Sequence, residues 1–168
     1  PRKLAEGLES QGEKEPDLKR SVRSDGDWPL SKAQIGIFLE CLKHNGKAIY
    51  NNPLLAELPK DIDLPRLCKA IENTVAAHPA LFTAFFVNAE GDPRQKPDTR
   101  TYSQRIQTLT GETFERQKTG LVKPFDILND RLFRIELFQT EDTAYLFMDF
   151  HHLVIDGTSF GILMADLD

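Results

Sequence analysis

The sequence predicts an α+β fold in which a mixed β-sheet is flanked by helices. Residues 31–44 and 63–77 carry apolar side chains at helical spacing, whereas residues 131–139 and 144–152 are β-prone runs joined by a short polar loop, most simply as a hairpin. Composition agrees with a globular class, because 40% of the 168 residues are hydrophobic and 28% are charged. The length is that of about one domain with a sizeable core.

Two N-terminal helices are marked by their caps and apolar stripes. Ser31 is a good N-cap, and Gln34 three residues later completes a capping box. The second helix is expected from about Asp63, with Pro65 in its first turn, where a backbone N–H is not needed. The expected inward-facing residues are Ile35, Phe38, Leu39 and Leu42 in the first helix and Leu64, Leu67, Ile71 and Val75 in the second.

The remaining elements alternate between strand and helix. Residues 48–58 predict a strand that Pro53 confines to a sheet edge or a bulge, and residues 81–89 predict another strand that ends at the turn EGDP. A weaker helix is expected within 111–122, and a final helix in 158–168. The sequence has neither a dinucleotide fingerprint nor a phosphate loop, so mixed α and β layers without a nucleotide site are expected.

The N-terminal residues differ in composition from the rest. Residues 1–27 are dense in charge and poor in apolar side chains, so they bury too little surface to offset the entropy of ordering. Residues 11–27 are therefore expected to be an interdomain linker. Leu4, Ala5 and Leu8 share one helical face, so residues 1–10 are expected to be the end of a helix from a preceding domain.

Charge, hydropathy and cysteine content exclude several function classes. The formal net charge is −5 and no basic patch stands out, which argues against a nucleic-acid partner. No apolar run approaches the ~20 residues of a membrane helix, and no secretory signal opens the chain. Cys41 and Cys68 both lie in helical patterns and are expected to be reduced, buried thiols, which makes a cytoplasmic location the default.

The stretch HHLVIDG at 151–157 is the candidate catalytic motif. Neighbouring side chains of a strand point to opposite faces, so His151 and His152 are expected on different faces and cannot easily bind one metal ion. No other Cys or His lies at ligand spacing. We therefore expect no metal site.

An acid–base role and a structural role both remain open for these residues. His152 is the last residue on an apolar face of its strand, at the C-terminal end. Burial at this position is expected to favour a neutral ring that can accept a proton. Asp156 is placed to orient a ring or to anchor the loop, and Gly157 lets the backbone approach a reacting group, with its N–H facing an oxyanion. The alternative is that both histidines are hydrogen-bonded core residues that cap a hairpin.

Several motifs, in one order along the chain, resemble a known family. HHLVIDG resembles the HHxxxDG signature of nonribosomal peptide synthetase condensation domains, which share a superfamily with chloramphenicol acetyltransferase. SKAQ at 31–34 is similar to the SxAQ opening motif, AHPALFTAF at 77–85 to RHExLRTxF, and KPFDILNDRLFR at 123–134 to PFDLxxxPLxR. The opening PRKLAEGLE resembles the end of a carrier protein's last helix. The resemblance identifies residues 28–168 as the N-terminal lobe of a two-lobed domain similar to chloramphenicol acetyltransferase.

The resemblance implies amide bond formation. The amine on a downstream carrier protein would attack a thioester on an upstream carrier, with both substrates on phosphopantetheine arms and no cofactor bound directly. His152 would take or position the amine proton, His151 and Asp156 would be mainly architectural, and Gly157 would keep the tunnel between the lobes open. The C-terminal lobe is missing from this sequence, so the isolated lobe is expected to be inactive.

Departures from the family pattern leave alternatives open. Ala77 and Phe82 stand where the second motif has arginines, and the latter arginine commonly pairs with the signature aspartate. Since an unpaired buried carboxylate is costly, Arg134 on the neighbouring strand is the expected partner of Asp156. The alternatives are an epimerization domain, which shares HHxxxDG, and a degenerate, non-catalytic domain that binds carriers.

Overall fold

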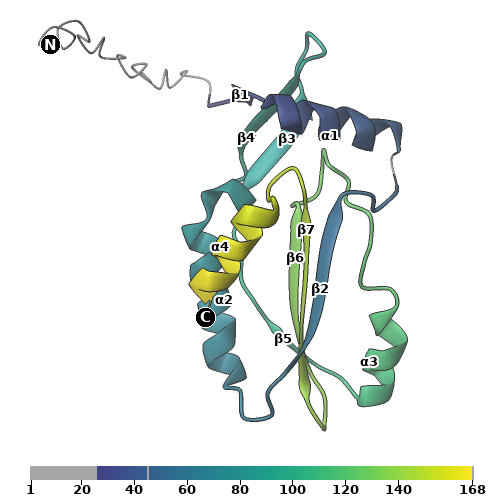
Figure 1. Cartoon of the computed structure of the whole chain (residues 1–168), viewed down its shortest axis with the longest axis vertical. Helices are drawn as coiled ribbons and strands as arrows, with labels where there is room; N and C mark the ends of the chain where they lie inside the picture. Colours follow the sequence, from purple (N-terminus) through teal and green to yellow (C-terminus); the bar gives the residue numbers. More distant parts are fainter. Residues whose placement is uncertain (1–25, 45, 168) are drawn as a thin grey trace, which may run out of the picture.

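The computed structural model of the chain describes residues 26–44 and 46–167. Its strands are β1 (Trp28–Pro29), β2 (Asn51–Leu58), β3 (Thr83–Val87), β4 (Pro93–Pro97), β5 (Ile106–Thr108), β6 (Phe133–Gln139) and β7 (Ala144–His151). Its helices are α1 (Lys32–Lys43), α2 (Leu64–Ala77), α3 (Gly111–Lys118) and α4 (Gly157–Leu167), with a 3-10 turn at Pro79–Leu81. The strands form two sheets in the orders β1-β4-β3 and β2-β7-β6-β5, and helices flank the second sheet (Figure 1). The α+β fold predicted from the sequence is confirmed.

Other expectations concerned the N-terminal residues, the two cysteines, membrane-spanning helices and metal sites. The expected carrier-like helix at 1–10 lies outside the described residues, and so does the linker at 11–27 apart from its last two residues. Both cysteines are free thiols, as predicted, but each is only partly buried. Within the described part of the chain, no helix is long and apolar enough to cross a membrane, and no cluster of three or more metal-ligating side chains is present.

The predicted cap of the first long helix and the predicted start of the second are confirmed. The Gln34 N–H donates to the Ser31 hydroxyl at 3.2 Å, and the Ser31 N–H donates to the Gln34 side-chain oxygen at 3.0 Å, which completes the capping box. Asp63 caps α2 by accepting a hydrogen bond from the Arg66 N–H at 3.0 Å. Helix α1 therefore begins at a fixed point beside the β1 strand, near the end of β7 that carries the candidate motif (Figure 1).

Strand β7 is the element that positions the candidate motif. It pairs antiparallel with β2 on one side and with β6 on the other, so it forms backbone hydrogen bonds along both edges. β5 joins β6 in parallel, which makes this sheet mixed, as predicted. β2 lies at an open edge of the sheet, and Pro53 occupies the edge position expected for a residue that lacks a backbone N–H.

Each face of β7 packs against a separate hydrophobic core. Leu146, Met148 and Phe150 belong to the larger core, to which α2 and α4 contribute. Phe147 packs with Phe114 of α3 in the smaller core on the other face. Because both faces are covered and close-packed, β7 is a rigid support for the residues that follow it.

Three short strands are not predicted by the sequence. β1 has 2 residues and β5 has 3, too few for an alternating pattern to stand out. β4 begins at Pro93 and ends at Pro97, and its interior is polar, so its own strand propensity is low. It forms because β3 pairs with it across a hairpin in which Gly91 adopts φ +88°.

Helix α4 is held against α2 (Figure 1). The Thr74 hydroxyl donates to the Asp166 carbonyl oxygen at 3.3 Å, and the His78 Nε2 lies 2.8 Å from the Asp166 carboxylate. Leu163 of α4 is 3% exposed and belongs to the larger core. The second half of α4 is therefore fixed to α2.

Candidate active site

A short turn, residues 152–156, connects β7 to α4 and carries the candidate motif. The His152 N–H donates to the Tyr50 carbonyl oxygen at 3.0 Å, and the Val154 N–H donates to the His151 carbonyl oxygen at 3.0 Å. Both hydrogen bonds involve the peptide group between His151 and His152, and the second closes a turn that contains the His152 α-carbon. The backbone that presents the His152 side chain is therefore fixed.

The two histidines have opposite environments. His151 is 3% exposed, whereas His152 is exposed. The sequence predicted burial of His152, and this prediction is wrong, because the pairing of β7 ends at His151 and the chain turns before His152. Burial, followed by the nearby His152, lowers the pKa of His151 to about 4. The buried ring that stays neutral is therefore that of the first histidine.

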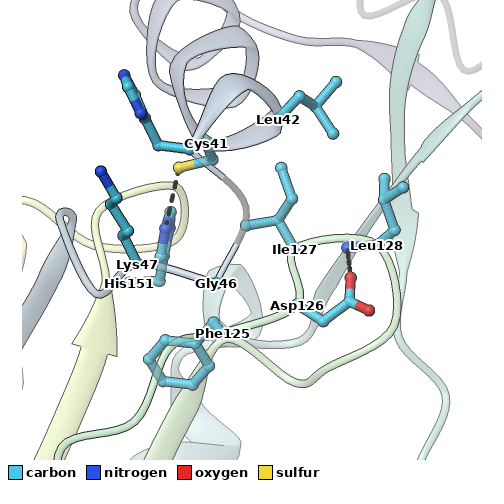
Figure 2. Close-up of a pocket in the computed structure, with 10 residues that line it drawn as sticks. Cys41, Leu42, Gly46, Lys47, Phe125, Asp126, Ile127, Leu128 and His151 are labelled. Carbon is cyan, nitrogen blue, oxygen red and sulfur yellow. Dashed lines mark hydrogen bonds between the residues drawn. The ribbon is translucent and has the colours of Figure 1, made fainter.

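Each nitrogen of the His151 ring has a polar neighbour. The Leu153 N–H donates to Nδ1 at 3.2 Å, and Nε2 lies 3.4 Å from the Sγ of Cys41 on α1 (Figure 2). The rings of Phe125 and Tyr50 flank the imidazole at centroid distances of 5.9 and 6.2 Å. Such contacts hold a ring in place rather than present it to a ligand.

Asp156 caps helix α4. Its Oδ1 accepts a hydrogen bond from the Ser159 N–H at 2.8 Å, and its carbonyl oxygen accepts one from the Phe160 N–H at 2.8 Å. The hydrogen bonds from Ser159 lower the pKa of this exposed carboxyl group. The expected ion pair between Asp156 and Arg134 is wrong, because the carboxylate is not buried and is satisfied by the helix N-terminus.

Gly157 lies at the open start of α4. A Cβ added at this position would meet no atom within 4 Å, and its φ does not lie in the left-handed region. Packing within the described chain therefore does not require a glycine here. The space beside the first turn of α4 is open.

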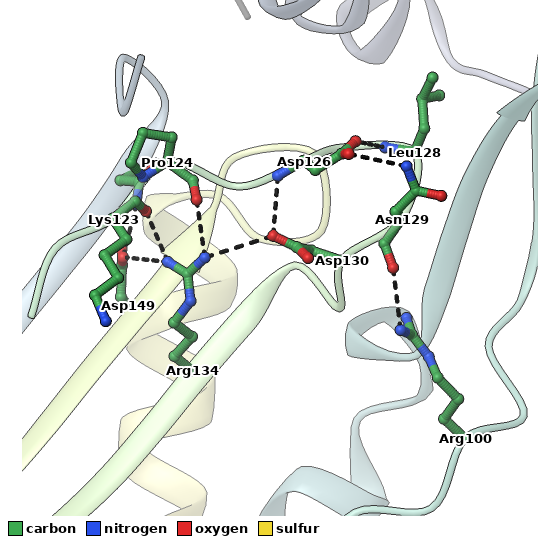
Figure 3. A network of polar contacts seen from close by, with 10 residues as sticks. Arg100, Lys123, Pro124, Asp126, Leu128, Asn129, Asp130, Arg134 and Asp149 are labelled. Atoms are coloured by element: carbon green, nitrogen blue, oxygen red, sulfur yellow. Dashed lines mark hydrogen bonds and ion pairs between the residues drawn. The ribbon is translucent and has the colours of Figure 1, made fainter. Parts of the chain in front are cut away.

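Arg134 ties the loop before β6 to strand β7. Its guanidinium donates to the carbonyl oxygens of Lys123 and Pro124 at 2.7 and 2.9 Å (Figure 3). Nη1 lies 3.4 Å from Oδ2 of the fully buried Asp149, and the guanidinium covers the Phe125 ring at 3.7 Å from its centroid. Arg134 therefore holds the segment KPFD against the strand that carries the candidate motif.

Three supporting residues were missed by sequence reasoning, namely Cys41, Asn51 and Asp149. Asn51 Nδ2 donates to Asp149 Oδ2 at 2.6 Å. Burial raises the pKa of Asp149, while the hydrogen bond from Asn51 and the charge of Arg134 oppose that rise. The sequence did contain a feature that pointed to Asp149, because it is the one charged residue in the run AYLFMDFHH. No such feature pointed to Cys41 and Asn51, since their partners lie 110 and 98 residues away in the sequence.

The arrangement places one imidazole at the surface of a rigid turn. Among residues 26–44 and 46–167, no side chain forms a hydrogen bond with the His152 ring, and the Tyr50 ring meets it edge-on at 6.5 Å. A positioned imidazole with open nitrogens is the group most often used as a general base. The geometry therefore supports proton transfer at His152 and a scaffold role for His151.

Comparison with known proteins decides which family this site belongs to. A family model described as Condensation domain matches residues 24–168. The chain belongs to the condensation-domain family. A plipastatin synthase polypeptide of Bacillus subtilis (strain 168) is 32% identical over 141 residues, which cover 83% of this chain and 6% of that protein. Bacitracin synthase 2 of Bacillus licheniformis is 28% identical over 159 residues, with 90% and 6% covered.

Solved condensation domains share the fold of this chain. The starter condensation domain of rhizomide synthetase RzmA matches with a TM-score of 0.71 and 18% identity, over 84% of this chain and 37% of that chain. The first condensation domain of the CDA synthetase matches with a TM-score of 0.66 and 22% identity, over 84% and 39%. The α+β lobe similar to chloramphenicol acetyltransferase is therefore confirmed as the fold.

The resemblance seen in the sequence would place Phe82 at the position of a motif arginine. The guanidinium of Arg131 lies over the Phe82 ring at 5.1 Å, and Arg131 Nε lies 3.3 Å from the Asp98 carboxylate. Asp156 is satisfied by the cap of α4. Asp156 therefore does not depend on an arginine at position 82. The expected cost of an unpaired, buried Asp156 carboxylate does not arise.

Proposed function

We propose that this chain is part of a condensation domain that forms an amide bond between two carrier-bound substrates. The observation that supports this most is the geometry of HHLVIDG, in which an exposed His152 follows a buried, hydrogen-bonded His151. That geometry occurs in a chain that the condensation-domain model matches over residues 24–168.

In this proposal the reaction is an acyl transfer from sulfur to nitrogen. The amine nitrogen of the acceptor attacks the thioester carbonyl of the donor, the new C–N bond forms, and the C–S bond breaks. His152 accepts the proton that the amine loses, and the proton finally goes to the departing thiolate. Donor and acceptor arrive on the phosphopantetheine arms of an upstream and a downstream peptidyl carrier protein, and no cofactor is bound directly.

The other site residues have supporting roles in this proposal. His151 and Asp156 fix the two ends of the turn, and Gly157 leaves open space where the substrates meet. Arg134 holds the KPFD segment beside the turn. Each acts on the position of His152 and not on the reacting atoms.

We also propose that residues 28–168 are the N-terminal lobe of a two-lobed domain, preceded by a linker at 11–27 and the end of a carrier helix at 1–10. The chain covers 37% to 39% of two solved condensation domains, in keeping with one lobe of two. The active site then lies between the lobes. The 168 residues alone are expected to give no product. The expected location is the cytoplasm, where the carrier proteins are the expected partners.

The test uses a two-lobe condensation domain that contains residues 24–168, with donor and acceptor carriers loaded. Mass spectrometry follows the amide product for the native sequence, for His152→Ala, and for the control His44→Ala. His44 is an exposed histidine whose ring pairs with Glu40 at 3.0 Å and forms no hydrogen bond with residues 151–157. We expect product from the native domain and the control, and its near-complete loss in His152→Ala.

Three results would contradict the proposal in different ways. Full activity of His152→Ala would remove His152 from the chemistry. Inversion of the donor α-carbon without condensation would favour an epimerization domain. Carrier binding without either reaction would indicate a degenerate, non-catalytic domain.

A further inference from the structure

We propose that Cys41 is a positioning residue of the condensation site, which fixes the orientation of His151 and through it the turn that carries His152. This inference rests on the proposed function for its kinetic part. Its structural part depends only on the described contacts between α1 and residues 151–153.

The hydrogen bonds assign the tautomer of His151. The Leu153 N–H donates to Nδ1, so Nδ1 carries no proton. A neutral imidazole has one N–H and one acceptor nitrogen, so the proton lies on Nε2. Nε2 faces the Sγ of Cys41 at 3.4 Å (Figure 2). The ring therefore donates to sulfur.

The Cys41 sulfur is a neutral thiol in this contact. Burial, followed by the charge of Glu40, raises the pKa of Cys41 to about 11. A thiol sulfur is a weak acceptor, but it is the only hydrogen-bond partner of the His151 Nε2 within the described residues. Removing it leaves a buried N–H without a partner, which is costly in a site that is 3% exposed.

Helix α1 contacts the turn at a second point. The Gln34 side-chain amide donates to the Leu153 carbonyl oxygen at 3.0 Å. Gln34 and Cys41 are seven residues apart, so they lie on the same face of α1. Leu153 thus binds Gln34 through its carbonyl and the His151 ring through its N–H. A rotated His151 ring would release the Leu153 N–H, and α1 would then contact the turn only through Gln34, beside the backbone hydrogen bonds of His152 and Val154.

The surroundings of Cys41 allow a clean substitution. A small cavity of about 40 Å³ lies between α1 and the KPFD segment, and Cys41, Lys47, Phe125 and His151 are among the residues that line it. A valine at position 41 therefore finds room for its extra methyl group. The change removes the acceptor sulfur while the apolar packing of the helix is kept.

The experiment compares Cys41→Val, Cys41→Ser and the control Cys68→Val in the two-lobe domain. Cys68 is the other free cysteine, on α2, and its thiol donates to the Gln104 carbonyl oxygen at 3.3 Å. We expect Cys41→Val to lower kcat roughly tenfold with KM unchanged, since misplaced groups slow the chemistry without touching substrate binding. Cys41→Ser, which keeps an acceptor, should restore most of kcat, and Cys68→Val should leave it unchanged.

A second measurement reports on His151 directly. Nitrogen-15 NMR of histidine-labelled protein should show a single His151 tautomer with the proton on Nε2 in the native domain and in Cys41→Ser. In Cys41→Val, the two ring nitrogen shifts should move toward each other as the ring samples other orientations. Native kcat together with a native spectrum in Cys41→Val would overturn the inference, and so would an equal loss of kcat in Cys41→Ser. A native domain without activity would instead contradict the proposed function, while the spectrum would still test the Cys41–His151 contact.

Discussion

Two arginine–carboxylate pairs lie near strand β6, and they have opposite electrostatics. Arg131 Nε lies 3.3 Å from Asp98, and Arg134 Nη1 lies 3.4 Å from Asp149. Each guanidinium also covers a phenylalanine ring, at 5.1 and 3.7 Å. Yet the pKa of Asp98 is lowered, to about 2, whereas the pKa of Asp149 is raised. The pairs are alike in composition, so their surroundings must make the difference.

The number of hydrogen-bond donors accounts for that difference. Burial raises the pKa of Asp98, but hydrogen bonds from the side chain and backbone of Arg100, at 2.8 and 3.0 Å, outweigh it together with Arg131. Asp149 is 0% exposed, and its Oδ1 has no partner among the described residues, nor has the Oδ1 of Asn51. The pair with an unsatisfied hydrogen-bond acceptor, Arg134 and Asp149, is the one on the strand that leads into HHLVIDG. Unfavourable local interactions of this kind are expected at functional sites.

The largest effect should come from breaking the poorly satisfied pair. Arg134→Ala removes the positive charge beside the buried Asp149, and we expect a loss of about 3–5 kcal/mol in the free energy of unfolding. Arg131→Ala is the matched change, and it should cost only about 1–2 kcal/mol because Arg100 still holds Asp98. Urea denaturation of the two-lobe domain at pH 7 measures both. Equal losses would remove the contrast between the two pairs.

The pH dependence of stability should have opposite signs at the two carboxylates. Because the pKa of Asp98 is lowered, Asp98 stabilises the fold above its ordinary pKa of 3.8, and this stabilisation of roughly 2 kcal/mol is lost as the pH falls toward 2. Because the pKa of Asp149 is raised, its contribution is present below 3.8 and is lost as the pH rises through the raised pKa.

Two asparagine variants test these signs. Urea midpoints between pH 3 and pH 7 should show Asp98→Asn losing ground to the native domain as the pH rises. Asp149→Asn should gain ground over the same range. Parallel trends in the two variants would mean that donor number does not set the two pKa values.

Patterns within one element predicted most of the fold. The cap at Ser31, the helix after Asp63 and the β6–β7 hairpin each depend on residues close in sequence, and each is confirmed. β4 and β5 depend on pairing with distant strands, and their own sequences are too short or too polar to show it. Local pattern therefore located β2, β3, β6, β7 and the helices, but it missed the short edge strands β1 and β5 and the central strand β4 of the smaller sheet.

The site was predicted less completely than the fold. The motif was found, but its histidines were expected on opposite faces of one strand, whereas His151 ends β7 and the exposed His152 follows it. The error on His152 arose because the end of β7 is set by its pairing with β2, which strand alternation does not reveal. The error on Arg134 arose because helix capping by Asp156 was not considered. Both depend on where an element ends, which is the least predictable feature of a sequence.

A third change tests whether Arg131 has replaced the missing family arginine. Phe82→Arg restores the residue type of the motif, but it removes the ring beneath Arg131 and the edge-on contact with Phe133 at 5.9 Å. Two cations then lie close together. We expect a loss of about 1 kcal/mol in unfolding free energy, with Phe82→Leu as the control that adds no charge. A gain in stability would mean that the new arginine finds a carboxylate, with Asp156 as the first candidate.

The smallest effect on stability should come from the residue proposed for the chemistry. His152 is exposed and its ring forms no hydrogen bond with the described residues, so His152→Ala should change the free energy of unfolding by less than about 0.5 kcal/mol. His151→Ala, its neighbour in sequence, should cost about 1–3 kcal/mol because it leaves the buried Leu153 N–H unpaired. Urea denaturation at pH 7 compares them. If His152→Ala were the more damaging change, His152 would be a structural residue, and its loss of product would no longer indicate proton transfer.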